Sequence, residues 1–241
     1  MSLLNYYPTL LVGFFYAIIH KKIGQFMTGL RNFYDLIHEC GNCDKNLLLG
    51  NGFSVAFSNA FCYDSILKES SFCNSTLFNN NSDFEKVIED LNFKRDVYQQ
   101  AYEEYGIASM FENWSDELKW ELVNIITDIQ SRVKPNKREK HNTFLFLSNF
   151  SNIFTLNYDL LLYWVINYAV ELYRQNKYEY YSIVGTDKFY PRDGFDTKYN
   201  EDDCIWYQDK WIQNIFYLHG GLHLFCDEQN IYKLKNDSVN N

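Results

Sequence analysis

The sequence predicts an α/β fold built on a central, mostly parallel sheet. Short apolar runs stop at glycine or polar turn residues in three places: 47–49 before Gly50, 153–156 before Asn157, and 215–218 before His219. Runs that end in this way are typical of buried strands in a parallel sheet. Open α/β sheets bind ligands just beyond the carboxyl ends of such strands. We therefore expect these strand ends to lie at one edge of the sheet and to form a site there.

Size and composition fit one domain, or a domain with a small helical insertion. The chain has 241 residues, of which 46% are hydrophobic, so it can bury a sizeable core. Its net charge is −9 and its densest basic run, 134–140, is short, so nucleic acid is not an expected partner. Cys40 and Cys43 form a CxxC pair, but a zinc ribbon needs a second pair. We expect no metal, and reduced thiols in a cytoplasmic protein.

Residues 1–26 are interpreted as an apolar N-terminal extension, followed by the domain at 27–235 and a fraying tail at 236–241. The apolar stretch 9–19 is too short to span a bilayer, and its positive charges follow it, unlike those of a signal peptide. The extension is either a short membrane-associating segment or the product of an upstream start, with Met27 as the true beginning. We favour the second interpretation and expect no clear membrane partner.

Apolar residues at helical spacing predict helices over 27–39, 83–105, a segment that starts at Trp114, 141–149, and a buried segment that starts at Asp159. The second and third form a helical insertion at about 83–135, which Pro135 ends. Turn-rich residues predict a surface loop at 70–82 and an irregular excursion at 174–212. A hairpin is expected from 223–225 and 231–234.

The first candidate cluster is Gly50-Asn51-Gly52-Phe53-Ser54, which follows the first predicted strand. Glycines after a strand let the backbone turn sharply and approach a diphosphate, and the helix behind them offers N–H groups to the anion. We expect Ser54 to cap that helix. The cluster lacks both the GxGxxG pattern and the lysine of a P-loop. A tight strand-to-helix turn with no ligand is therefore an equal alternative.

The second candidate cluster is Thr155-Leu156-Asn157-Tyr158-Asp159, after the next strand. Asn157 lies between an apolar strand and an apolar helix, where a polar side chain must find partners. Its amide donates and accepts, so it can hold a ribose hydroxyl, an amide or a water. Asp159 has a simpler explanation as the N-cap of the following helix.

The third candidate is His219, which ends an apolar strand and precedes Gly220 and Gly221. Histidine exchanges protons readily near neutral pH, and we expect the two glycines to leave room for a ligand beside its ring. A structural histidine with satisfied hydrogen bonds is the alternative. His223 is expected to lie in a strand and to face outward or into packing, without a role in the site.

Together the clusters resemble a known set of motifs. GNGFS resembles the GAGxS loop of sirtuin-type NAD-binding domains, TLNYD resembles their TQNID motif, and LHG resembles their catalytic His-Gly. Bacterial sirtuin-like proteins carry similar LLLGNGFS, FTTNYDLLLYW and LHG motifs, and several of that wider group are NAD-depleting effectors of anti-phage defence. The motifs span 46 to about 226, so the resemblance covers most of the chain. It implies a Rossmann-like three-layer domain with a helical insertion.

The resemblance also implies a reaction, cleavage of the nicotinamide–ribose bond of NAD to give nicotinamide and ADP-ribose. NAD then binds along Gly50, Asn51, Gly52, Phe53, Ser54, Thr155 and Gly220. By the same resemblance, Asn157 holds the nicotinamide-side ribose or the attacking water. Asp159 orients the carboxamide, and His219 is the general base.

Some residues depart from the sirtuin pattern. Asn51 replaces a small residue, Leu156 the usual Gln, and Tyr158 the usual Ile, although Tyr158 matches the defence-type branch. The four-cysteine zinc module of protein deacylases is absent from the sequence. The expected function is thus NAD hydrolysis by a regulated cytoplasmic effector, acting as a homo-oligomer or with a defence-system partner. The alternatives are an inactive or truncated module that binds NAD or ADP-ribose, and a protein deacylase.

Overall fold

A computed structural model of the chain describes residues 16–18, 33–41, 43–79, 81–102, 105–175, 191–196, 204–206, 213–227 and 230–233. Its described residues divide into two compact units. Those within Ser54–Lys134 form one, and those within Leu11–Phe53 and Pro135–Asn241 form the other. The unit boundary lies inside a short helix, between Phe53 and Ser54.

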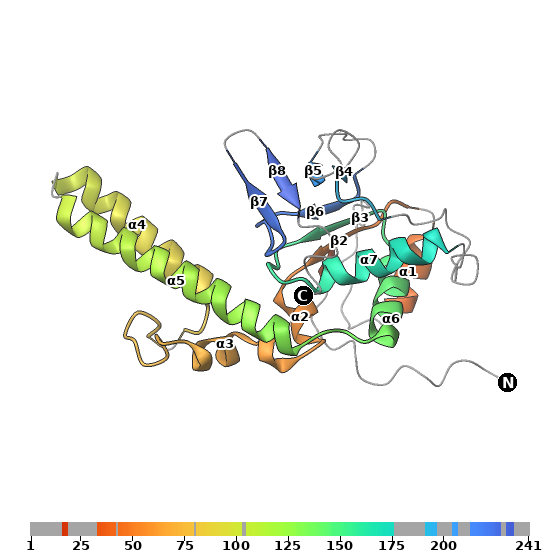
Figure 1. Cartoon of the computed structure of the whole chain (residues 1–241), viewed down its shortest axis with the longest axis horizontal. Coiled ribbons are helices and arrows are strands. Elements are labelled where there is room, and N and C mark those ends of the chain that lie inside the picture. Colours follow the sequence, from red (N-terminus) through yellow and green to blue (C-terminus); the bar gives the residue numbers. More distant parts are fainter. Residues whose placement is uncertain are drawn as a thin grey trace. The chain divides into compact units, whose positions relative to one another are not determined.

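A four-stranded sheet in the order β1-β2-β3-β6 organises the second unit. It consists of β1 (Tyr16–Ile18), β2 (Asn46–Leu49), β3 (Asn152–Thr155) and β6 (Ile215–Tyr217). β1 is antiparallel to β2. Strands β2, β3 and β6 are parallel and lie side by side in Figure 1. The mixed α/β class with a small parallel sheet is therefore confirmed, as are the strands predicted from the three apolar runs.

Alternation along the strands explains their packing. On one face Leu47, Ile153 and Ile215 are fully buried. Successive side chains point to opposite faces of a sheet, and on the other face Phe154 stacks on Phe216 with ring centroids 4.8 Å apart. Apolar contacts on both faces are what a short parallel sheet requires.

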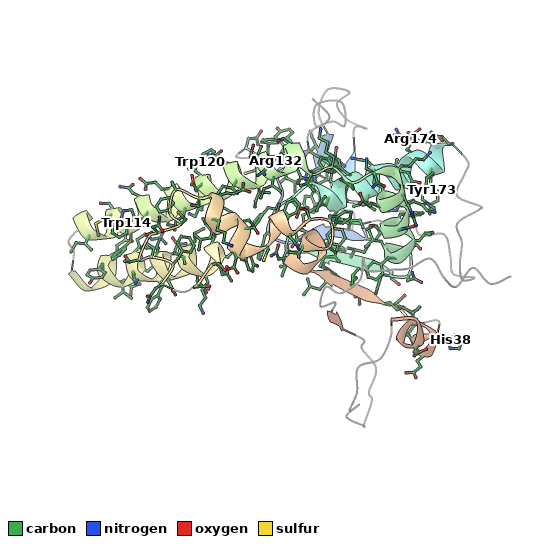
Figure 2. The ribbon with its side chains drawn as sticks, turned by 90° about the horizontal axis from the view of Figure 1, so that it is seen from below. His38, Trp114, Trp120, Arg132, Tyr173 and Arg174 are labelled. Carbon is green, nitrogen blue, oxygen red and sulfur yellow. The ribbon has the colours of Figure 1, made fainter. Side chains whose placement is uncertain are left out.

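Four helices of the structure contain residues of this unit: α1 (Phe33–Cys40), α2 (Asn51–Val55), α6 (Lys137–Leu147) and α7 (Leu161–Arg174). α6 begins at a capping box, in which Asn136 accepts from the Glu139 N–H and Glu139 accepts from the Asn136 N–H. α7 is the predicted buried helix, since every residue from Leu161 to Ile166 is buried. Figure 2 labels Tyr173 and Arg174 at its carboxyl end.

A second sheet follows in the same unit, with the antiparallel order β4-β5-β8-β7. Its strands are β4 (Phe195–Asp196), β5 (Cys204–Trp206), β7 (Leu224–Cys226) and β8 (Ile231–Lys233). The pairing of β7 with β8 confirms the predicted hairpin. β4 and β5 were expected to be irregular, and they show that the segment 174–212 contributes strands; most of that segment lies outside the described residues.

The other unit is helical. It contains η2 (Asn59–Phe61), α3 (Tyr63–Glu69), α4 (Phe84–Tyr102) and α5 (Tyr105–Arg132), and α4 and α5 lie side by side (Figure 1). The prediction for α4 is confirmed, but the predicted start of α5 at Trp114 is wrong. α5 begins at Tyr105, and Ser115, which follows Trp114 inside it, donates its hydroxyl to Asn92 Oδ1 at 3.0 Å. It therefore links α5 to α4 instead of capping a helix.

The prediction that Ser54 caps the helix after the glycine cluster is wrong. Ser54 lies inside α2, and Ser58 is the serine that caps the next element, by accepting from the Ala60 N–H. The helix starts immediately after Gly50, which leaves no room for Ser54 at its amino end. Among the described residues, no helix combines the length and apolarity needed to cross a bilayer.

Candidate functional site

The carboxyl ends of β2, β3 and β6 lie together at one edge of the sheet. Leu49 is in register with Thr155, and Thr155 with Tyr217. The ladder extends one residue further, because Leu156 N donates to Leu49 O and Leu218 N donates to Thr155 O, each at 2.9 Å. The next residues are those of the candidate clusters. The expected meeting of the clusters at one edge is confirmed.

Asn157 is held directly against the glycine cluster. Its side-chain Nδ2 donates to Gly50 O at 3.0 Å, and its backbone N–H donates to Thr155 Oγ1 at 3.1 Å. Thr155 itself is buried, at 1% exposure. Thr155 therefore supports the turn that carries Asn157, and the amide of Asn157 adds a side-chain link between the ends of β2 and β3.

Within the glycine cluster, the residues differ in what they present to a ligand. A Cβ built on Gly50 would meet no described atom within 4 Å, and Gly50 has no positive φ. Phe53 and Ser54 are buried, at 5% and 1% exposure. The more accessible part of the cluster is thus Gly50, Asn51 and Gly52, whereas Phe53 and Ser54 face the protein and are poor candidates for ligand contact.

Asp159 is buried and starts α7. Its Oδ1 accepts from Leu161 N at 2.9 Å, and Leu160 occupies the N-cap position. The prediction of Asp159 as the N-cap is therefore wrong by one position. Asp159 precedes the N-cap residue, and its carboxylate still accepts from the first N–H of the helix, as a capping side chain does. A carboxylate near the amino end of a helix is also favoured by the helix dipole.

His219 is exposed and lies beside Tyr158. The Tyr158 hydroxyl is 3.4 Å from His219 Nδ1. The centroids of the two rings are 5.9 Å apart, and the ring planes are inclined at 31°. His219 therefore contacts Tyr158, the residue that follows Asn157 in the chain. In the sequence, Tyr158 stands out only as a departure from the sirtuin motif, and its position next to Asn157 is the one signal of its place in the site.

The two glycines after His219 have reasons other than room for a ligand. Gly220 has φ +80°, a conformation that other residues rarely adopt. A Cβ on Gly221 would lie 3.0 Å from His223 Cε1 and 3.1 Å from His223 Nδ1. Backbone conformation at Gly220 and packing at Gly221 therefore account for them within the chain.

His223 precedes β7 and belongs to a buried aromatic cluster behind the site. Its ring stacks on Tyr163 at 4.4 Å and meets the edge of Tyr217 at 4.8 Å. Its two ring nitrogens and the Tyr217 hydroxyl have no hydrogen-bond partner among the described residues. Burial, reinforced by Lys233, lowers the pKa of His223 to about 3. Burial also raises the pKa of Tyr217 well above its ordinary value, with contributions from Asp193, Tyr163 and Asp159.

Metal ligands do not gather in the part of the chain that the structure describes. Within those ranges, no group of three or more His, Cys, Asp and Glu residues is placed to hold a metal ion. The site at the sheet edge offers instead an amide, an imidazole, a phenol and open backbone.

Comparison with protein families gives one match that covers most of the chain. A model described as "Domain of unknown function (DUF4917)" matches residues 47–240. The chain belongs to the DUF4917 family. Comparisons with curated proteins and with solved structures give no significant match.

The DUF4917 match contains all of the candidate residues. It begins inside β2 and continues past β8, so Gly50, Asn157 and His219 are all part of the DUF4917 domain. The family description assigns no function. What this DUF4917 site does is therefore inferred from its chemistry.

Proposed function

We propose that the chain is an NAD hydrolase with a Rossmann-like, sirtuin-type domain, of the kind that depletes NAD in anti-phage defence. The observation that carries the proposal is the meeting of Gly50, Asn157 and His219 at one sheet edge. Asn157 Nδ2 lies 3.0 Å from Gly50 O. The hydroxyl oxygen of the adjacent Tyr158 lies 3.4 Å from His219 Nδ1. Open backbone, an amide and an imidazole are the groups that such a reaction needs.

In the proposed reaction, the bond between ribose C1′ and the nicotinamide nitrogen breaks. Its electron pair stays on that nitrogen and removes the positive charge of the pyridinium. Water adds its oxygen to C1′ while His219 takes a proton from the water. The products are nicotinamide, ADP-ribose and one proton, which exposed His219 releases to solvent. A positioned base of this kind contributes about 10²–10⁴ in rate.

The other residues have binding roles in this proposal. Open space over Gly50 lets the backbone approach the dinucleotide closely, and the first turn of α2 adds N–H donors. The hydrogen bond to Gly50 fixes the amide of Asn157, which would hold the ribose or the water. Asp159 would orient the carboxamide while it keeps its hydrogen bond to Leu161 N.

A nucleotide-binding module without turnover is the second candidate function. It is favoured by the fact that two of the proposed catalytic side chains already serve the fold. Asn157 bonds to Gly50 O, and Asp159 bonds to the start of α7. Such a module would be stabilised by NAD or ADP-ribose and would release no product.

The test is incubation of the purified protein with NAD, followed by chromatography for nicotinamide and ADP-ribose. Wild type is compared with Asn157→Ala, His219→Ala and a control, His38→Ala. His38 is exposed on α1 (Figure 2), before the amino end of β2, and is remote from the proposed site. We expect wild type and His38→Ala to release nicotinamide at equal rates. His219→Ala should be about 10²–10⁴ times slower.

Each result separates the candidates. Full activity in both Asn157→Ala and His219→Ala would exclude this site. Thermal stabilisation by ADP-ribose without nicotinamide release would support the binding module. Neither binding nor release in wild type would contradict both proposals.

A further inference from the structure

Tyr158 contacts the segment 219–222 at two points. Its hydroxyl oxygen lies 3.4 Å from His219 Nδ1, and its backbone oxygen accepts from Leu222 N at 2.8 Å. One contact therefore holds the imidazole, and the other holds the chain just beyond it. Only the first depends on the side chain of Tyr158.

The direction of the first hydrogen bond determines what His219 can do. A neutral imidazole carries one N–H, and the partner of one ring nitrogen selects which nitrogen that is. If the phenol donates to Nδ1, the proton of the ring is on Nε2, and Nε2 cannot take another. If Nδ1–H donates to the phenolic oxygen, Nε2 keeps its lone pair and can act as a base.

We propose that Tyr158 is a positioning residue that accepts a hydrogen bond from Nδ1–H of His219 and so keeps Nε2 available as the base. This inference rests on the proposed NAD hydrolysis for its catalytic consequence. When Nε2 takes a proton from the attacking water, the ring becomes an imidazolium. Its Nδ1–H still donates to Tyr158, and the proton on Nε2 later passes to solvent. A base held by a third group in this way is a recurring arrangement in enzymes.

A second tyrosine–histidine pair provides a matched control. The Tyr168 hydroxyl on α7 lies 3.3 Å from His141 Nδ1 on α6, which is nearly the same contact. Tyr168 and His141 belong to the packing of α6 against α7, and neither is among the candidate site residues. Tyr158→Phe and Tyr168→Phe each remove one hydroxyl and keep the ring.

The first measurement is steady-state NAD hydrolysis by the full-length protein. We expect Tyr158→Phe to lower kcat about 3- to 10-fold, the range for loss of one neutral hydrogen bond, with KM changed less than twofold. Tyr168→Phe should leave both constants unchanged. A Tyr158→Phe enzyme with wild-type kcat, or with KM alone altered, would overturn the inference.

The second measurement is independent of activity. Correlation of the ring nitrogens and protons by NMR of histidine-¹⁵N-labelled protein identifies the tautomer of His219, assigned by the signal lost in His219→Gln. We expect Nδ1–H in wild type and in Tyr168→Phe, and a shift toward Nε2–H in Tyr158→Phe. An Nε2–H tautomer in wild type would overturn the inference even if the enzyme hydrolyses NAD. Conversely, an inactive protein with the expected tautomers would refute the proposed function and retain the Tyr158–His219 hydrogen bond.

Discussion

Two glycines near the sheet edge, Gly50 and Gly221, differ in whether the fold leaves room for a larger side chain. At Gly221 the obstacle is internal, because a Cβ would lie 3.0 Å from the ring of His223. At Gly50 neither packing against the described residues nor backbone conformation requires glycine, since a Cβ there would meet no described atom within 4 Å and its φ is not positive. A glycine that the fold does not need is expected where a ligand approaches the backbone closely.

These two residues give opposite predictions for alanine substitution. Gly50→Ala should change the free energy of unfolding by no more than about 0.5 kcal/mol, yet weaken ADP-ribose binding at least tenfold, because its methyl group occupies the space of the ligand. Gly221→Ala should lower the free energy of unfolding by about 1–3 kcal/mol through overpacking. Urea unfolding and calorimetric titration measure the two quantities. Unchanged binding in Gly50→Ala would show that the ligand does not approach this backbone.

At the scale of elements, the start of α7 joins fold and site. The chain leaves β3 at Thr155, turns at Asn157 and enters α7 at Leu161. Hydrogen bonds from Asn157 N to Thr155 Oγ1 and from Leu161 N to Asp159 Oδ1 fix this connection. The first turn of α7 is buried, so packing fixes the end of this connection. The connection in turn positions Asn157 and Tyr158.

Asp159 is the residue whose structural and proposed catalytic roles can be separated. Asp159→Ala should lower the free energy of unfolding by about 1 kcal/mol, the usual cost of losing a cap. Asp159→Asn keeps an oxygen acceptor for Leu161 N and should be destabilised much less. If Asp159→Asn is stable but slow in nicotinamide release, the carboxylate has a role beyond the cap. If both variants lose activity only in proportion to lost folded protein, the role of Asp159 is structural.

For the molecule as a whole, the buried cluster around His223 links stability to pH. His223 is fully buried between Tyr163 and Tyr217, and its pKa is lowered from 6.5 to about 3. Below pH 6.5 the unfolded chain therefore takes up a proton on this residue that the folded chain does not. The free energy of unfolding therefore decreases as the pH falls from about 6.5 to about 3, by at most about 1.4 kcal/mol per pH unit.

We expect His223→Phe to remove this dependence while it keeps an aromatic ring against Tyr163. Relative to wild type, the variant should gain about 1–2 kcal/mol in free energy of unfolding when the pH is lowered from 7.0 to 5.0. Urea unfolding of both proteins at the two pH values, followed by circular dichroism, gives the difference, from which other titrating groups cancel. A difference that is the same at both pH values would mean that His223 titrates normally in the folded state.

Local patterns in the sequence by themselves determined the parallel strands, the buried helix α7 and the β7–β8 hairpin. They also placed Gly50, Asn157 and His219 at one edge, because the carboxyl ends of parallel strands must lie on the same side of a sheet. These features follow from the spacing of apolar residues and from turn chemistry, which act over a few neighbouring positions.

Only the tertiary structure decided which side chains meet across those ends. Three contacts join residues that lie far apart in the sequence: Asn157 with Gly50, Tyr158 with His219, and His223 with Tyr163. The same holds for the hydrogen bond from Ser115 on α5 to Asn92 on α4. Such pairings depend on how strands and helices pack on one another, and the periodicity of a single segment carries no information about its distant partner.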